Sequence, residues 1–257
     1  MNTYSVSRLA LALAFGVTLS ACSSTPADQQ PSTQTAPGTA SRPVLTADEA
    51  KNFLPASYFQ SLDPNAAAWT PSAISLPAQP DFVVGPAGTQ GVTHTTIQAA
   101  VDAAITRHSN RRQFIAIMPG EYAGTVYVPA APGALTLYGT GEKPIDVKIS
   151  AAIDSEMDPV SWRHQVNPGG KYMPGKPAWY MYDSCQNKRT ATIGVMCSAV
   201  FWSQNNDLQL QNLTIANNLG DSVDAGTHQA VALRSDGDRV QINNVNILGR
   251  QNTFFVT

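Results

Sequence analysis

The sequence predicts an all-β fold, a right-handed single-stranded parallel β-helix, mainly because it contains an internal repeat. Residues 208–215, LQLQNLTI, recur 32 residues later as residues 240–247, VQINNVNI. In each copy apolar and polar residues alternate, and the alternation slips at a Gln-Asn or Asn-Asn pair, which indicates a corner between two strands. Repeated corners between apolar strands are typical of solenoids whose coils stack in parallel. An antiparallel β-sandwich is the alternative, and it explains the in-phase repeat poorly.

The N-terminus has the pattern of a bacterial lipoprotein signal peptide over residues 1–21. Arg8 precedes an apolar run over residues 9–19, which is too short to span a bilayer as a helix. The run leads into LSAC, which resembles a lipobox and implies lipidation of Cys22. Ser23 follows where inner-membrane retention would favour Asp, so we expect an outer-membrane anchor. An ordinary signal peptide with an incidental cysteine, or an uncleaved membrane anchor, is the alternative.

Residues 22–42 are expected to form a disordered tether, and residues 43–257 a single folded domain. The tether is rich in Ser, Thr, Pro, Gln and Ala, so it cannot bury enough surface to offset its conformational entropy. Without Arg8 the mature chain would carry 15 basic and 18 acidic residues, a net charge of −3. No basic patch with interleaved aromatic residues is present in the sequence, which argues against nucleic acid as a partner.

One amphipathic helix is predicted ahead of the strands. Thr95 with Gln98 three residues later fits a capping box that would begin the helix. Apolar side chains then recur at the spacing of one helical face, at Ile97, Ala100, Val101, Ala104 and Ile105. Because the end of a solenoid exposes core and strand edge, we expect this helix to cap the N-terminal end.

Short strands follow the helix and continue to the last residue. Period-two alternation between Gly and Pro turns predicts strands over residues 114–118, 125–128, 135–138 and 147–149. Residues 254–257, FFVT, read as an apolar strand with no cap behind it. We therefore expect a fragment of a longer protein, from which the C-terminal coils are missing and which would tend to aggregate on its own.

Two of the three cysteines are expected to pair. Cys185 and Cys197 have eleven residues between them, and in an oxidising periplasm a disulfide closing such a loop contributes about 3 kcal/mol. Two buried free thiols are the alternative. No histidine lies close in sequence to either cysteine, so we predict neither a metal site nor a cofactor.

Two motifs near the C-terminus resemble those of the pectinesterase family. Residues 229–234, QAVALR, and residues 251–254, QNTF, match the family patterns Q-A-V-A-L-R and Q-D-T-L in order and spacing. Residues 95–104 look like its opening helix, and residues 118–124 like its G-x-Y-x-E motif, with Gly124 in place of the glutamate. The resemblance implies a parallel β-helix, of which residues 43–257 would be the N-terminal part.

The whole chain is similar, more closely, to the pectinesterase-like outer-membrane lipoproteins of enteric bacteria, which carry a provisional acyl-CoA thioester hydrolase label. The family chemistry implied by the resemblance is ester hydrolysis through an aspartate nucleophile and an acyl-enzyme anhydride. That aspartate, in a D-x-[IV]-x-G element, and the active-site arginine come later in the family and are absent from residues 1–257. We therefore expect this stretch alone to be inactive.

The resemblance also implies the roles of three residues. Gln229 and Gln251 match the glutamines whose amides stabilise the oxyanion, each worth about 3 kcal/mol; without the resemblance, amides in a corner ladder would be favoured. Asn252 stands where the family has its general acid/base aspartate. An amide cannot transfer protons at neutral pH, so departing methoxide would lack its acid. A thiolate leaving group needs no such acid, because the pKa of its thiol is about 8.5.

The predicted function is a carboxylic ester hydrolase of the outer membrane, monomeric at full length, acting on a pectin-like polysaccharide. A thioester hydrolase acting on a small acyl substrate is one alternative, although coenzyme A thioesters are cytoplasmic. A carbohydrate-binding lipoprotein that has lost catalysis is another. An intact aspartate and arginine beyond Thr257 would favour a hydrolase, and their loss a binding module.

Residues 162–197 match none of the family motifs and are expected to form a long excursion from the solenoid. Four aromatic residues there are candidates for lining a substrate groove: Trp162, Trp179, Tyr180 and Tyr182. The favoured interpretation is that they pack a small core of the excursion itself, because large aromatic side chains contribute most when they are buried.

Overall fold

The computed structural model describes residues 44–54, 68–220, 226 and 228–257. The chain divides into two compact units, Met1–Tyr58 and Phe59–Thr257. The first holds α1 (Ala47–Ala50) and a 3₁₀ turn, η1 (Lys51–Phe53), and Thr46 forms a capping box with Glu49. Cys22, the predicted signal peptide and the predicted tether lie outside the described residues.

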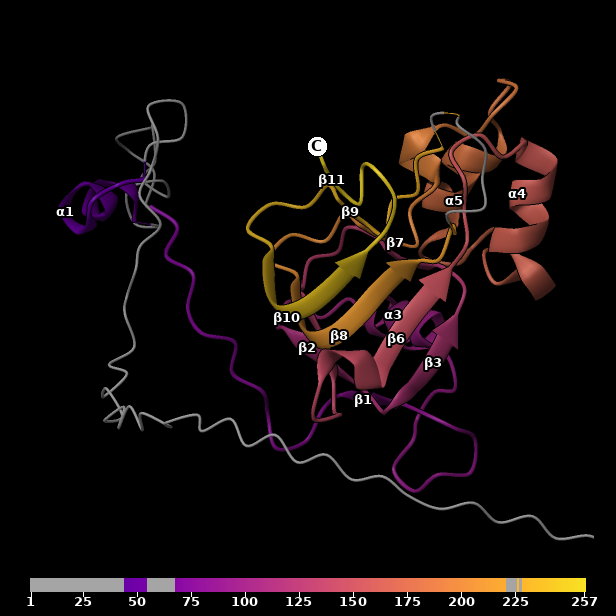
Figure 1. The fold of residues 1–257 in the computed structure, drawn as a ribbon. Coiled ribbons are helices and arrows are strands. Elements are labelled where there is room, and N and C mark those ends of the chain that lie inside the picture. Colours follow the sequence, from indigo (N-terminus) through magenta and orange to yellow (C-terminus); the bar gives the residue numbers. More distant parts are fainter. Residues whose placement is uncertain (1–43, 55–67, 221–225, 227) are drawn as a thin grey trace, which may run out of the picture. The chain divides into compact units, whose positions relative to one another are not determined.

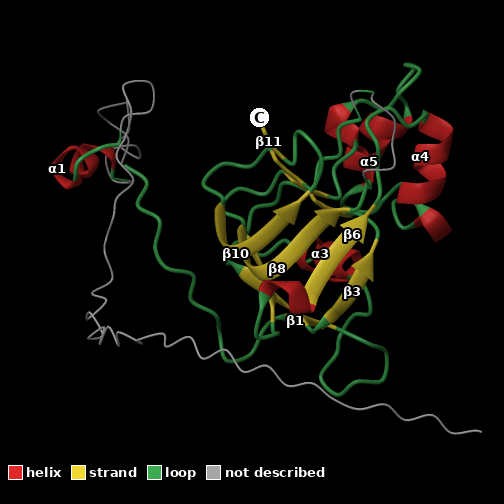
Figure 2. Ribbon diagram, viewed as in Figure 1, coloured by secondary structure: helices red, strands yellow, loops and turns green. Residues whose placement is uncertain are grey.

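The second unit is a parallel β-helix whose strands form three faces (Figures 1 and 2). The first face contains β1 (Phe82–Val84), β2 (Gln113–Ile117), β5 (Leu135–Gly139) and the first halves of β8 (Gln209–Asn217) and β10 (Gln241–Leu248). The second contains β3 (Gly120–Ala123), β6 (Val147–Ala151) and the second halves of β8 and β10. The third contains β4 (Val126–Val128), β7 (Phe201–Ser203), β9 (Leu233–Ser235) and β11 (Phe254–Val256). The pairings between these strands are parallel, and η2 (Pro144–Asp146) precedes β6.

The sequence repeat is one turn of the solenoid. β10 lies on β8 with each pair offset by 32 residues, from Gln241 on Gln209 to Leu248 on Ala216. The predicted corner is confirmed at Asn212 and Asn244, whose φ angles are 52° and 51°. Asparagine tolerates this left-handed conformation better than most residues. The two side chains stack across the coils, since Asn244 Nδ2 donates to Asn212 Oδ1 at 2.9 Å.

α3 (Ile97–Thr106) covers the N-terminal end of the solenoid, and its apolar face joins the core between the strand faces. The predicted start was wrong by one residue. The N-cap is Thr96, not Thr95, and its hydroxyl accepts a hydrogen bond from Ala99 N at 3.2 Å. Gln98 is buried and bonds to the backbone of Tyr127 in β4 instead, donating to Tyr127 O at 2.9 Å and accepting from Tyr127 N at 2.8 Å.

Between β6 and β7 the chain leaves the coil for residues 152–200, which we call the insert. It contains α4 (Pro159–Val166), η3 (Pro168–Gly170), α5 (Trp179–Gln186) and η4 (Val195–Cys197). A second cluster of buried residues joins Trp162, Tyr172 and Tyr182 of the insert to Tyr127 and Trp202 of the third face. Because neighbouring residues of β4 and β7 belong to the central core, this cluster lies on the outer side of that face.

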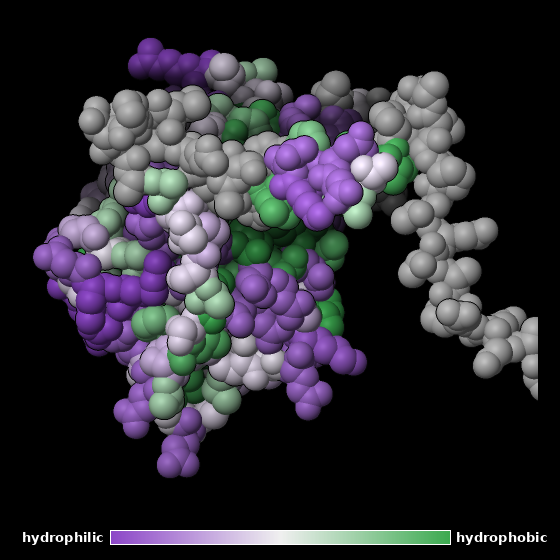
Figure 3. Space-filling model, turned by 90° about the vertical axis from the view of Figure 1, so that its left-hand side faces the viewer, coloured by the Kyte–Doolittle hydropathy of each residue, from purple (hydrophilic) through white to green (hydrophobic). Residues whose placement is uncertain are grey.

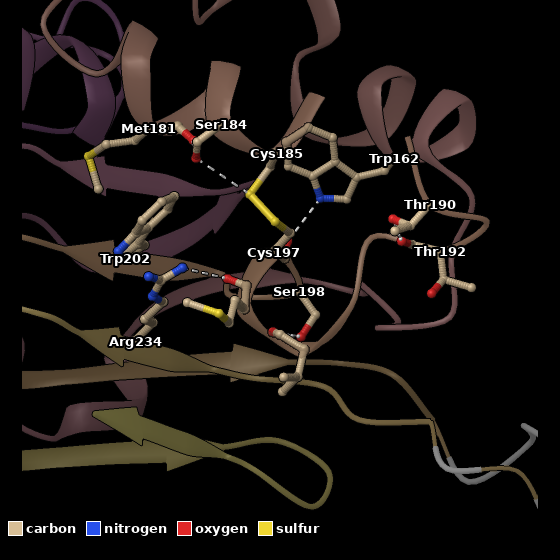
Figure 4. Close-up of a disulfide and its surroundings, with 12 residues drawn as sticks. Trp162, Met181, Ser184, Cys185, Thr190, Thr192, Cys197, Ser198, Trp202 and Arg234 are labelled. Carbon is tan, nitrogen blue, oxygen red and sulfur yellow. Dashed lines mark hydrogen bonds between the residues drawn. A yellow bond between two sulfur atoms is a disulfide. The ribbon is translucent and has the colours of Figure 1, made fainter. Parts of the chain in front are cut away.

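The favoured interpretation, that these aromatic residues pack a core of the insert, is confirmed for Trp162 and Tyr182. Trp162 is fully buried, with its ring centroid 5.2 Å from that of Tyr182. Its indole nitrogen donates to Cys197 O at 3.0 Å (Figure 4). Trp179 packs against the edge of the cluster. Tyr180 remains 48% exposed, and it lines a hollow of about 340 Å³ that Trp202 also lines.

A disulfide joins Cys185 at the end of α5 to Cys197 in η4, with the two Cα atoms 5.8 Å apart (Figure 4). Both cysteines are buried in the cluster of the insert. Within the described residues, no grouping of His, Cys, Asp and Glu side chains could hold a metal ion. The same part of the chain contains no helix with the length and apolar character needed to cross a bilayer.

The last coil is less covered than the coils before it. Leu248, Phe254 and Val256 are 49%, 45% and 62% exposed, whereas Leu233 in the preceding coil is fully buried. In the view from the side that lies to the left in Figure 1, hydrophobic side chains gather between hydrophilic ones (Figure 3). Ile242, Val245 and Ile247 of β10 pack against the apolar interior but are only partly buried, so the interior is partly open at this coil.

Candidate active site

The three residues predicted for the site lie in turns that connect the second face of the solenoid to the third. Gln229 is in the turn between β8 and β9, and Gln251 and Asn252 are in the turn between β10 and β11. The insert occupies the equivalent turn of the preceding coil, between β6 and β7. Since the coils stack in register, these turns form one corner of the molecule although they are far apart in sequence.

A short antiparallel bridge joins the two turns. Ala230 N donates to Arg250 O at 2.9 Å, and Arg250 N donates to Ala230 O at 3.1 Å. In such a bridge the residue before one partner lies across from the residue after the other. Gln229 and Gln251 therefore lie at the same end of the bridge, which we call the glutamine corner.

The backbone of Gln229 is held by the first residues of the insert. Ser155 N donates to Gln229 O at 2.9 Å, and Gln229 N donates to the hydroxyl of Ser155 at 3.1 Å. Ser155 is buried, so water competes little for these bonds. The insert therefore fixes the backbone of Gln229.

Asn217, at the end of β8, ties the same region together. It is 5% exposed, and its Nδ2 donates to Ile153 O at 2.8 Å, to Ser198 O at 3.0 Å and to Val231 O at 3.2 Å. The two ends of the insert and the chain after Gln229 thus share one buried amide. Asn217 was not predicted as part of the site, although a polar residue directly after an apolar strand was a signal for it.

An imidazole and a carboxylate lie beside the glutamine corner. His228 Nδ1 is 2.5 Å from Asp154 Oδ2 and 3.9 Å from Glu156 Oε2, and the His228 and Asp154 side chains are 12% and 15% exposed. This pair was not predicted, because its two members are 74 residues apart in the sequence. The signal was the position of His228, directly before QAVALR.

Gln251 and Asn252 are both exposed, and Gln251 has a φ angle of 53°. Thr253 N donates to Gln251 O and closes this tight turn. Within the described part of the chain the two side-chain amides form no hydrogen bonds, so their N–H groups can reach a bound molecule. An amide at position 252 donates and accepts hydrogen bonds but transfers no proton.

Arg234, the last residue of QAVALR, stabilises the fold through contacts with three neighbouring residues. Its guanidinium lies 4.0 Å from the ring centroid of Trp202, is 2.8 Å from an oxygen of Asp236, and donates to Met196 O at 3.1 Å. Figure 4 shows Arg234 beside Trp202. With 7% of its surface exposed, Arg234 fixes η4 against the third face.

Comparison with curated proteins shows extensive similarity. An Escherichia coli K12 protein, provisionally named acyl-CoA thioester hydrolase YbhC, is 79% identical over 257 residues, 100% of this chain and 60% of that protein. Pectinesterase B of Dickeya dadantii is 50% identical over 263 aligned residues, 100% of this chain and 61% of that protein. No protein-family model matches the chain. The chain spans about three fifths of the length of these relatives.

Solved structures agree with these similarities. The crystal structure of E. coli YbhC matches with a TM-score of 0.81 and 76% identity, covering 91% of this chain and 59% of that one. Rice weevil pectin methyl esterase matches with a TM-score of 0.71 and 39% identity, covering 87% of this chain and 56% of that one.

Proposed function

Because this chain belongs to the pectinesterase family, we propose that the whole protein is a carboxylic ester hydrolase acting on a pectin-like cell-wall polysaccharide. The glutamine corner is the observation that carries this proposal. Two amides at one end of a hydrogen-bonded bridge can donate to the oxyanion of a tetrahedral intermediate. The pectinesterases among the relatives support a polysaccharide substrate.

Asn252 favours a second candidate reaction, hydrolysis of a thioester. A departing methoxide needs a proton from the residue at this position, and an amide supplies none. A thiolate leaves without protonation near neutral pH, because the pKa of a thiol is about 8.5. The provisional name of the E. coli relative agrees with this alternative. In either reaction we place the nucleophilic aspartate and the arginine in the part of the longer relatives that this chain does not span.

The role of the glutamine corner can be tested by assaying the full-length protein on methylated polygalacturonate and on an acyl thioester. We expect Gln251→Ala to lower turnover of the hydrolysed substrate about 10²-fold, because one oxyanion donor is lost. Gln241→Ala is the matched control, since the Gln241 amide belongs to a ladder with Gln209 on the first face. Equal losses in the two variants would show that the corner has no special role. Binding of polysaccharide without turnover of either substrate would point to a binding protein.

We further propose that Cys22 anchors the protein in the outer membrane through lipids. The support is the lipobox-like segment that ends at this cysteine. We expect Cys22→Ala to move the protein out of the membrane fraction or to stall its processing, because no acyl chains can be attached at this position. Ser23→Asp should keep the lipid and shift the protein to the inner membrane. Unchanged outer-membrane fractionation of Cys22→Ala would disprove the anchor.

A further inference from the structure

A large cavity lies between α3 and the chain that follows η3, and it shares no residue with the glutamine corner. Its volume is about 1100 Å³. Gln98 and Asp102 of α3 line one side, and Lys171 and Lys176 of the insert line the other. Ligand sites of proteins are commonly about 300–1,000 Å³, so this cavity is large enough for a short oligosaccharide.

Lys171 places an ammonium group in the wall of this cavity without a carboxylate partner among the described residues. Its Nζ donates to Thr125 O at 2.7 Å and to the Thr125 hydroxyl at 3.1 Å. Gly124, with a φ angle of 103°, leaves room for it, because a Cβ there would lie 3.3 Å from Nζ. An ammonium group has three donors, so one remains for a ligand.

A half-buried cation with neutral partners is unfavourable until an anion neutralises it. Burial lowers the pKa of the Lys171 amine to about 8, and the charge of Asp102 opposes this shift. Within the described residues, Lys171 therefore lacks a negatively charged group in direct contact with its amine.

Asp102 supplies a hydrogen-bond acceptor on the opposite wall. It is 9% exposed, and its Oδ1 accepts from Gln98 Nε2 at 2.9 Å. Its other oxygen takes part in no hydrogen bond within the described residues. Burial raises the pKa of this carboxyl, while the Gln98 bond and the charges of Lys176 and Lys171 lower it. A ligand that reaches Lys171 with a carboxylate and also carries a hydroxyl can satisfy both groups.

We propose that this cavity binds an acidic saccharide, with a uronic acid carboxylate on Lys171 and a sugar hydroxyl donating to Asp102. The exposed Lys176 would contact a second carboxylate of an oligosaccharide. A simple anion lacks the donor that Asp102 requires, and a neutral sugar leaves Lys171 without a counter-charge. The choice of a saccharide rests on the proposed function, whereas the cavity and its charges do not. The protein would thus hold de-esterified polysaccharide apart from the glutamine corner.

Affinity for such a ligand should follow protonation of Lys171. Lys171 also lines a second cavity of about 200 Å³, which Glu121 and Tyr122 border. The Lys171 Nζ lies 4.8 Å from the centroid of the Tyr172 ring, on which Tyr127 stacks. The other charged or titratable groups that line the large cavity are His94, Asp102, Arg107 and Lys176. Arg107 already has partners, because its Nη1 lies 3.6 Å from Asp81 Oδ1 and its guanidinium carbon 4.1 Å from the centroid of the Phe82 ring. Glu121 is paired as well, with its Oε1 3.8 Å from Lys148 Nζ. A carboxylate binds the protonated amine, so affinity should be full below pH 8 and should fall by up to about tenfold per pH unit above it.

The test is calorimetric titration of the full-length protein with de-esterified trigalacturonate from pH 6 to pH 9. We expect weaker binding above pH 8, no binding of a neutral galactose trisaccharide, and loss of at least about tenfold in affinity in Lys171→Met. Lys176→Met should weaken binding a few-fold. Lys188→Met, which removes a lysine of the insert outside the cavity, should bind like the wild type.

Three results would overturn the proposal. One is an affinity that does not change between pH 7 and pH 9. Another is equally tight binding of inorganic phosphate or coenzyme A, which would assign the cavity to phosphorylated ligands. The third is binding that Gln251→Ala abolishes and Lys176→Met leaves intact, which would place the saccharide at the glutamine corner. If Lys171→Met fails to fold, the wild-type pH profile and Lys176→Met decide. Because binding is measured without turnover, absence of hydrolysis would contradict the proposed enzyme and leave this test valid.

Discussion

Asn252→Asp is expected to raise turnover of methylated polygalacturonate by the full-length protein about 10²–10⁴-fold, the usual contribution of a general acid/base. The substitution places a carboxyl group in the turn that carries Gln251, next to the amide that we assign to the oxyanion. It can protonate departing methoxide and then activate water. A thioester should respond much less, because its leaving group departs as the anion. The quantity to measure is the ratio of methyl-ester to thioester turnover before and after the substitution.

Two further variants make this experiment specific. Asn243→Asp adds the same charge to an exposed position of the same coil, in β10, and should leave the ratio unchanged. Gln251→Ala in the Asn252→Asp background should remove most of the recovered activity, because the oxyanion loses a donor. If the wild type already hydrolyses methyl esters as fast as Asn252→Asp, position 252 is not the acid/base site, and the family mechanism does not transfer to this chain.

The solenoid could be predicted from the sequence because one coil repeats its own pattern. Gln209 and Gln241, or Ile215 and Ile247, occupy equivalent places in successive coils, so their spacing is the length of a turn. The polar pair in each copy marked the corner because asparagine is among the few residues that accept its φ angle. The motif resemblance is confirmed by the similarity to the pectinesterases.

The remaining features depend on contacts that no local pattern encodes. Gln98 has the spacing of a capping residue, yet burying its amide against the backbone of Tyr127 gives two hydrogen bonds in a place that water does not reach. That partner lies 29 residues away, so the sequence gives no sign of it. The same holds for Asp154 with His228, and for Lys171 with Thr125, where the insert returns to the solenoid.

The insert was predicted to leave the coil and to pack aromatic residues in a core of its own, but which of them would remain exposed could not be predicted. Trp162, Tyr180 and Tyr182 are all large aromatic residues of the same segment. Only the packing of the folded chain distinguishes the two that are buried, Trp162 and Tyr182, from Tyr180, which is exposed. The disulfide between Cys185 and Cys197 closes this core on one side. The insert is therefore a small packed layer on the third face, and its first residues hold Gln229.

Trp162→Ala is expected to lower the free energy of unfolding by about 3–5 kcal/mol, the usual cost of removing a fully buried large aromatic side chain. The variant loses the stacking on Tyr182 and the hydrogen bond to Cys197 O, and it leaves a cavity beside the disulfide. Denaturant unfolding of the oxidised full-length protein measures the change. Tyr180→Ala, which truncates an aromatic residue of α5 that is 48% exposed, is the matched control and should lose much less.

Trp162→Ala should also lower turnover, because it affects the position of Gln229 in the glutamine corner. Trp162 packs α4, and the chain entering α4 contains Ser155, which bonds both backbone groups of Gln229. A loosened insert would let this segment move, so we expect turnover to fall in Trp162→Ala even where the protein is still folded. Trp162→Phe keeps most of the packing and loses the indole hydrogen bond, about 1 kcal/mol, and should retain turnover. If Trp162→Ala is as destabilised as expected but turns over substrate like the wild type, then the insert stabilises the fold without positioning Gln229.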